Sequence, residues 1–122
     1  MLNNLQLQLS VEPFNGIVVA RISGVPTPEL FALCEERVAK LCEERGTSLV
    51  MYDAVDVEPP GQGADWFQRP IDLERTIRAK RVIVGPNLLV AQLIRSVLAI
   101  EPCGSHVVYN DFATALAWLK TP

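Results

Sequence analysis

The alternation of apolar and polar residues divides the chain into short strand-like runs and longer helix-like runs. Residues 5–9 alternate strictly between leucine and glutamine, which predicts a strand that is buried on one face. Residues 12–16 are rich in turn-forming residues and end in Asn15 and Gly16, and residues 17–23 predict a second strand. We therefore expect the chain to open with an antiparallel β-hairpin.

Three further strands are expected along the chain. Residues 49–53 have too few polar positions for a half-exposed strand, which favours a central parallel strand. Residues 81–85 are rich in β-branched residues and end at a Gly-Pro pair, as a buried strand that leads into a helix does. Residues 105–109 predict a short final strand. The connection at 55–63 should be irregular, because it contains two prolines and two glycines.

Helical spacing is clearest after Thr27 and Pro28, which are typical of a helix N-cap and of the first helical position. Gly46 suits the end of this helix. The charged residues within it, Glu35 among them, are expected to point away from the apolar face. That face is expected to contain Leu30, Phe31, Cys34, Val38, Leu41 and Cys42.

Three more helices complete the expected fold, at residues 66–77, at residues 88–100 and after Asn110 as a cap. The last helix should turn Phe112, Ala115, Leu116 and Leu119 inward. The resulting order is ββαβαβαβα within one domain, residues 1–122. This order predicts an α/β fold with a single-layer mixed sheet: an opening antiparallel hairpin, then mainly parallel strands, with helices packed on the sheet.

Composition and charge exclude several classes of function. A formal net charge of −3 over 122 residues argues against nucleic acid as a partner. No apolar run is long enough for an integral membrane segment, and the first residues do not resemble a secretory signal. Three cysteines without a close pair do not form a disulfide framework, which makes the cytoplasm the expected location.

No catalytic constellation, metal site or cofactor motif emerges from the sequence. Asp53 and Asp56 lie near the carboxyl end of a central strand, where open α/β folds place ligand sites. With Trp66 and Asn87 they are the ligand-binding candidates, for a cleft between the loop at 55–66 and the helix at 86–101. His106 is the sole histidine, and we assign it no catalytic role.

The helix at 88–100 carries more apolar surface than one sheet can cover. Its apolar residues span an arc of roughly 200°, whereas a surface helix needs little more than about 100°. Such surplus beside a charged residue is typical of a protein interface. The helix at 66–77 could instead cover one flank. The interface candidates, for a second copy or another protein, are Leu88, Ala91, Ile94, Arg95 and Leu98.

The whole chain resembles the STAS domains, and most closely their SpoIIAA-like branch. The resemblance rests on the element order, on Asp53 before a Gly-containing loop, on Trp66, on the segment 81–85, and on the closing segment 115–119. It implies the anti-sigma-factor-antagonist fold and protein partners. That family carries a phosphorylatable serine or threonine after the third strand, whereas residues 49–75 of this chain contain neither.

We therefore interpret the chain as a non-enzymatic, cytoplasmic protein-interaction or regulatory module that binds a protein partner or forms a homodimer. The alternative is a carrier or sensor of a small apolar or anionic ligand in the cleft between 55–66 and 86–101. A third interpretation, an enzyme with hydrolase-type chemistry at Asp53 or His106, has the least support.

Overall fold

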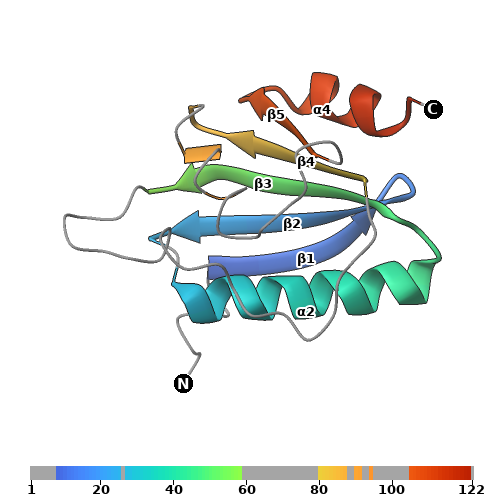
Figure 1. Cartoon of the computed structure of the whole chain (residues 1–122), viewed down its shortest axis with the longest axis horizontal. Helices are drawn as coiled ribbons and strands as arrows, with labels where there is room; N and C mark the ends of the chain where they lie inside the picture. The colour runs from blue at the N-terminus through green and yellow to red at the C-terminus, as the bar shows by residue number, and fades with distance from the viewer. Residues whose placement is uncertain are drawn as a thin grey trace.

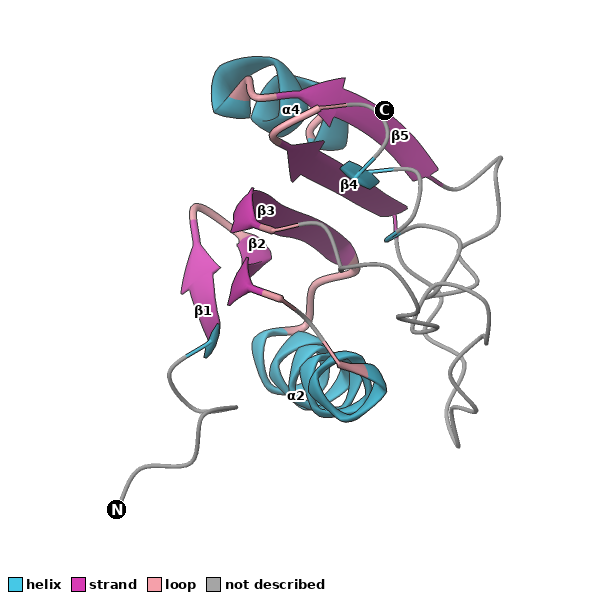
Figure 2. Ribbon diagram, turned by 90° about the vertical axis from the view of Figure 1, so that its left-hand side faces the viewer, coloured by secondary structure: helices cyan, strands magenta, loops and turns pink. Residues whose placement is uncertain are grey.

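The computed structural model describes residues 8–25, 27–58, 80–87, 90, 91, 94 and 105–121. Within these residues a five-stranded sheet carries helices on both faces (Figures 1 and 2). None of the described helices is long and apolar enough to cross a membrane.

The strands are ordered β1-β2-β3-β4-β5 across the sheet, the same order as along the chain. The first two, β1 (Leu9–Phe14) and β2 (Ile17–Gly24), form an antiparallel hairpin. The other three run parallel to β2: β3 (Leu49–Val57), β4 (Lys80–Gly85) and β5 (Ser105–Tyr109). The predicted α/β class, with a mixed sheet that opens in a hairpin, is confirmed.

The hairpin lies further along the chain than the leucine-glutamine alternation indicated. Strand β1 continues through Phe14, and the turn consists of Asn15 and Gly16 alone, with φ angles of 49° and 81°. Both angles suit the tight turns that match strand twist. Pro13 is tolerated within β1 because an edge strand can leave one face of its backbone unpaired. The predicted strand at 5–9 lies mostly outside the described residues.

Helix α2 (Pro28–Arg45) begins and ends where the sequence predicted. The Thr27 hydroxyl accepts a hydrogen bond from the Leu30 backbone N–H at 3.1 Å, and Gly46 closes the helix at φ 64°. Its apolar face is buried at Leu30, Phe31, Cys34, Val38 and Cys42, while Leu41 is half-buried. The prediction for Glu35 was wrong: this side chain is only 2% exposed.

Strand β3 is longer than predicted. Residues 55–57 were expected to be irregular, yet they continue the strand because Asp56 and Val57 pair with Ser23 and Gly24 of β2. The remainder of the expected irregular connection, and the helix at 66–77, lie outside the described residues.

Helix α4 (Phe112–Leu119) is capped by Asp111 and not by Asn110. Asn110 has a φ angle of 45°, so the chain turns there before the helix begins. Ala115 and Leu119 are buried as predicted. Phe112 is 42% exposed, which contradicts its expected inward position; it is the first residue of the helix, and its ring borders a groove in the surface.

Two layers of core lie on the two faces of the sheet. On one face, α2 packs against β1 and β2, and the helical residues Val90, Ala91 and Ile94 join the same core. On the opposite face, α4 packs against β4 and β3. Among the described residues, no helix covers β1 and β2 on this second face.

Candidate functional site

Strand alternation places a row of polar and apolar side chains on the sheet face opposite α2. The registers align Glu12 with Val19 and Met51 across three strands, and Ser10 with Arg21 and Asp53 one row further. Residues two apart on a strand share a face, so these rows lie side by side. The face therefore has one row that is apolar except for Glu12 at its edge, and a polar row next to it.

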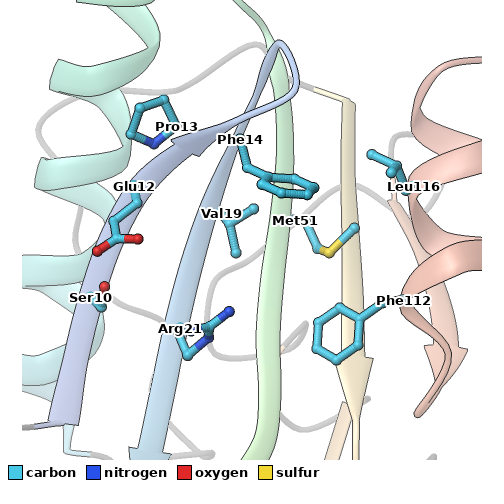
Figure 3. A pocket seen from close by; sticks show the side chains of 9 residues that line it. All are labelled: Ser10, Glu12, Pro13, Phe14, Val19, Arg21, Met51, Phe112 and Leu116. Carbon is cyan, nitrogen blue, oxygen red and sulfur yellow. The ribbon is translucent and has the colours of Figure 1, made fainter.

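A groove of about 260 Å³ lies on this face, between the edge strand β1 and helix α4 (Figure 3). Val19 and Met51 form its floor, and Phe14 and Phe112 stand at its sides. Phe14 is 54% exposed, so both rings present apolar surface to solvent. The lining residues are Ser10, Glu12, Pro13, Phe14, Val19, Arg21, Met51, Phe112 and Leu116.

Arg21 supplies the positive charge of this groove. Its Nε donates to Asp53 Oδ2 at 2.8 Å, and the Arg21 side chain is 62% exposed whereas that of Asp53 is 9% exposed. The second oxygen of Asp53 accepts from the Val55 backbone N–H at 3.2 Å. Asp53, a ligand-binding candidate near the carboxyl end of β3, is thus engaged within the sheet by Arg21 and by the strand backbone.

Glu12 is the negative group of the groove. It is exposed on the edge strand and makes no hydrogen bond or ion pair with any other described residue. Glu12 and Arg21 lie diagonally across the hairpin, within reach of long side chains. Arg21 nevertheless pairs with Asp53, whose other carboxylate oxygen accepts from the Val55 backbone N–H.

The other ligand-binding candidates do not gather at one place among the described residues. Asp56 is exposed near the end of β3, and Asn87 is exposed after β4. Asn87 Oδ1 accepts from the Val90 backbone N–H at 2.9 Å, which is the geometry of a helix cap. Trp66, and with it most of the expected cleft between 55–66 and 86–101, lies outside the described residues.

Two of the interface candidates are core residues in the folded chain. Ala91 and Ile94 are both fully buried in the core on the α2 face. Ala91 also approaches β4 closely, since a Cβ placed on Gly85 would lie 3.1 Å from the Ala91 Cβ. A partner of this helix would therefore have to meet its other residues. The remaining candidates, Leu88, Arg95 and Leu98, lie outside the described residues.

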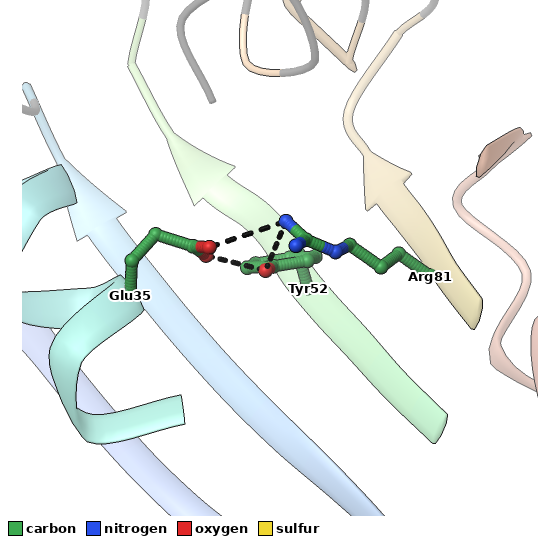
Figure 4. A network of polar contacts seen from close by, with 3 residues as sticks. All are labelled: Glu35, Tyr52 and Arg81. Atoms are coloured by element: carbon green, nitrogen blue, oxygen red, sulfur yellow. Dashed lines mark hydrogen bonds and ion pairs between the residues drawn. The ribbon is translucent and has the colours of Figure 1, made fainter. Parts of the chain in front are cut away.

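The sequence pattern missed a buried polar network beneath α2 (Figure 4). Arg81 Nη1 lies 3.1 Å from Glu35 Oε2 and 3.4 Å from the Tyr52 hydroxyl oxygen, and the Tyr52 hydroxyl donates to Glu35 Oε1. Burial raises the pKa of the Glu35 carboxyl, against the opposing influence of the Arg81 guanidinium. Burial and the neighbouring Glu35 carboxylate raise the pKa of Tyr52 well above its usual value, so this phenol stays protonated and donates.

This network and the described cysteines offer no reactive group to solvent. Burial raises the pKa of Cys34 well above its ordinary value and also raises that of Cys42, and both thiols are free. A protonated, buried thiol is a poor nucleophile. Among the residues that the structure describes, no group of three histidine, cysteine or acidic side chains could hold a metal ion.

The groove residues escaped the sequence analysis, although a signal was present. Arg21 interrupts an otherwise apolar strand, and alternation places it on the same face as Val19. Pairing it with Asp53 required the register between β2 and β3, which the sequence does not supply.

Several solved structures resemble the chain, among them the following two. One is an anti-sigma factor antagonist from Mycobacterium paratuberculosis, at a TM-score of 0.51 and 17% sequence identity over 93% of each chain. The other is an uncharacterised protein with a SpoIIAA-like fold from Shewanella loihica, at a TM-score of 0.49 and 16% identity over 91% of each chain. No family model matches the chain, and no curated protein matches it significantly. At 17% identity the likeness to the anti-sigma factor antagonist establishes architecture alone, and this architecture is the STAS-type fold that the sequence predicted.

Proposed function

We propose that the chain is a non-enzymatic protein-interaction module of the STAS type, which regulates a protein partner or a second copy of itself. The observation that carries this proposal is the sheet face over β1 and β2, which none of the described helices covers, with the exposed rings of Phe14 and Phe112 beside it. Exposed apolar side chains that gather on one face mark interaction sites. The fold shared with an anti-sigma factor antagonist is consistent with this role.

The described ionisable groups support binding over catalysis. Asp53 is engaged by Arg21 and by the backbone of Val55, and Glu35 is engaged by Tyr52 and Arg81. Both acids are engaged by neighbouring groups of the fold, and neither lies in an open cleft beside a nucleophile or base. We place the module in the cytoplasm, where the thiols of Cys34 and Cys42 would stay reduced.

Photo-crosslinking in an extract of the source cells tests this function. A photoreactive residue is placed in turn at Phe14, Phe112, Glu36 and Lys40, which samples both the groove face and the exposed side of α2. At least one position should yield a discrete, saturable crosslink to one protein or to a second copy of the chain. If no position gives such a product at the protein's native concentration, the interaction role is excluded.

A further inference from the structure

The groove between β1 and α4 combines an apolar floor with one cation and one anion, which restricts what it can hold. Its volume of about 260 Å³ falls below the roughly 300–1,000 Å³ of small-molecule pockets, which also enclose most of their ligand. This groove is open along the sheet face (Figure 3). Its size suits one large apolar side chain that belongs to a bigger molecule.

Arg21 determines which charge the bound molecule should carry next to its apolar side chain. Asp53 engages only the Nε of Arg21, and the described residues accept no hydrogen bond from its two terminal nitrogens. Figure 3 shows the guanidinium beside Val19, on the side of the groove toward Phe112. A guanidinium held at one edge is preorganised to donate two parallel hydrogen bonds to a carboxylate.

Glu12 limits the negative charge that the groove accepts. It lines the groove from β1 and has no partner among the described residues, so it repels any anion that enters. A single carboxylate can approach Arg21 and stay away from Glu12, whereas a strongly acidic segment cannot. The local charge therefore favours one acidic residue next to the apolar anchor.

We infer that this groove docks a protein partner through an aromatic or large aliphatic side chain, with an adjacent acidic residue bound by Arg21. The inference rests on the proposed interaction function and specifies the chemistry of the partner. Binding pockets that receive one anchor side chain inside a polar rim are the usual centres of protein interfaces.

Short capped peptides test this inference. The probes are acetyl-Gly-Phe-Asp-Gly-amide and its Asp-Phe reversal, compared with Phe-Asn and Asn-Phe forms and with Ala in place of Phe. The chain has only two methionines, and Met51 lies in the groove floor. The ¹³C-methyl signal of Met51 therefore reports binding, and that of Met1 is an internal control. At least one of the two Asp-containing peptides should bind about two- to fivefold more tightly than the corresponding Asn peptide, as expected for an exposed ion pair. The peptides with Ala in place of Phe should not bind.

Three variants separate the contributions. Arg21→Gln should bring the ratio of acidic to amide affinity to about one, whereas Glu12→Gln should raise it, because a repulsive charge is removed. Glu12 has no described partner, so its variant does not depend on preserving a contact of the fold. Phe112→Ala should weaken every peptide. Tyr109→Ala is the matched control, since Tyr109 is 59% exposed but does not line the groove.

Several results would overturn the inference. The first is a Met51 signal that no peptide shifts, and the second is equal affinity of the wild-type chain for the acidic and the amide peptides. The third is binding of phenylacetate at least as tight as that of the peptides, because this result would indicate a site for small molecules. If no peptide shifts the Met51 signal but Glu36 or Lys40 gives a discrete crosslink, this docking site is rejected and the proposed interaction function is retained. The absence of both signals would reject both proposals.

Discussion

At the scale of single residues, Glu35, Tyr52 and Arg81 link three separate elements. They come from α2, β3 and β4, and their side chains meet within the core on the α2 face. A buried charge is tolerated only when a partner and further hydrogen bonds replace water. Here each carboxylate oxygen of Glu35 has a separate donor. The network therefore fixes how the helix sits on the sheet.

Because burial dominates at Glu35, its pKa predicts a pH dependence of stability. The folded chain holds the Glu35 proton more tightly than the unfolded chain, whose carboxyl has the ordinary pKa of 4.5. The free energy of unfolding of wild type should therefore fall, relative to Glu35→Gln, as pH rises from below 4.5 through the raised pKa. Urea unfolding of both proteins between about pH 3.5 and about pH 7 measures this difference, in which all other groups cancel.

The sign of that slope discriminates between two physical accounts. If the free energy of unfolding of wild type instead rose with pH, relative to that of Glu35→Gln, the Arg81 ion pair would outweigh the loss of hydration at Glu35. The pKa of Glu35 would then be lowered, and the network would act chiefly as a salt bridge.

Removing the cation tests the same network at constant pH. Arg81→Met should lower the free energy of unfolding by about 3–5 kcal/mol at neutral pH, because the buried Glu35 carboxylate loses its counter-charge and must stay unpaired or take up a proton. The double variant Arg81→Met with Glu35→Gln should lose less than the sum of the two single losses. Additive losses in chemical denaturation would show that the two side chains do not interact.

The sequence could not predict this network, although it predicted the neighbouring core residues. Helical periodicity correctly buried Cys34 and Val38, and a charged residue between them was taken to be exposed. Glu35 is buried because its partners arrive from 17 and 46 residues further along the chain. A local pattern contains no information about pairs at such separations.

At the scale of elements, the start of a helix was predicted correctly where the capping side chain bonds to a backbone N–H in the first turn of the same helix. Thr27 fulfils its predicted role at the start of α2, because the hydroxyl reaches the Leu30 N–H three residues on. At α4 the predicted cap was one residue early, since Asn110 adopts a positive φ angle that no local rule distinguishes from a cap. The observed ends of the strands differ more from the predicted ends, because the length of a strand depends on how far its neighbour pairs with it. Strand β3 extends to Val57 only because β2 continues beside it.

The cap of α2 should contribute measurably to stability. Thr27→Ala removes the acceptor of the Leu30 N–H and should lower the free energy of unfolding by about 1 kcal/mol. Thr27→Ser retains the hydroxyl and serves as the matched variant, with a much smaller loss. Thermal or urea unfolding checks both. Equal losses from Ala and Ser would mean that the methyl group, not the hydrogen bond, matters here.

The start of α4 separates the two candidate caps. Asp111→Ala should lower the melting temperature, because Asp111 accepts hydrogen bonds from the backbone N–H and the hydroxyl of Thr114. Asn110→Gly should not lower it, since glycine adopts a positive φ angle freely. Hydrogen bonds from Thr114 lower the pKa of Asp111, so its contribution is present above the ordinary pKa of 3.8 and is lost as pH falls through the lowered pKa. A greater loss from Asn110→Gly would restore Asn110 as the cap.

At the scale of the whole molecule, the two faces of the sheet are unequally covered. One face carries α2 over β1 and β2, whereas on the other face α4 covers β4 and β3, and no other described helix covers the hairpin. The order of strands and helices was predictable because alternation and helical spacing are local. The coverage of each face was not, because it depends on which side of the sheet each helix takes. Position in the sheet, more than any motif, makes Arg21 and Phe14 candidates for binding.

The hydroxyl groups of residues 49–75 carry a prediction about phosphorylation. Residues 49–75 contain no serine or threonine, so we predict that this segment accepts no phosphate. Their one hydroxyl group is that of Tyr52, which is fully buried and hydrogen-bonded to Glu35. A phosphate brings almost two negative charges, which this site cannot accommodate without unfolding. Incubation with ATP and an extract of the source cells, followed by peptide mass mapping, should therefore find no phosphate on 49–75. A phosphopeptide from that segment would contradict this prediction.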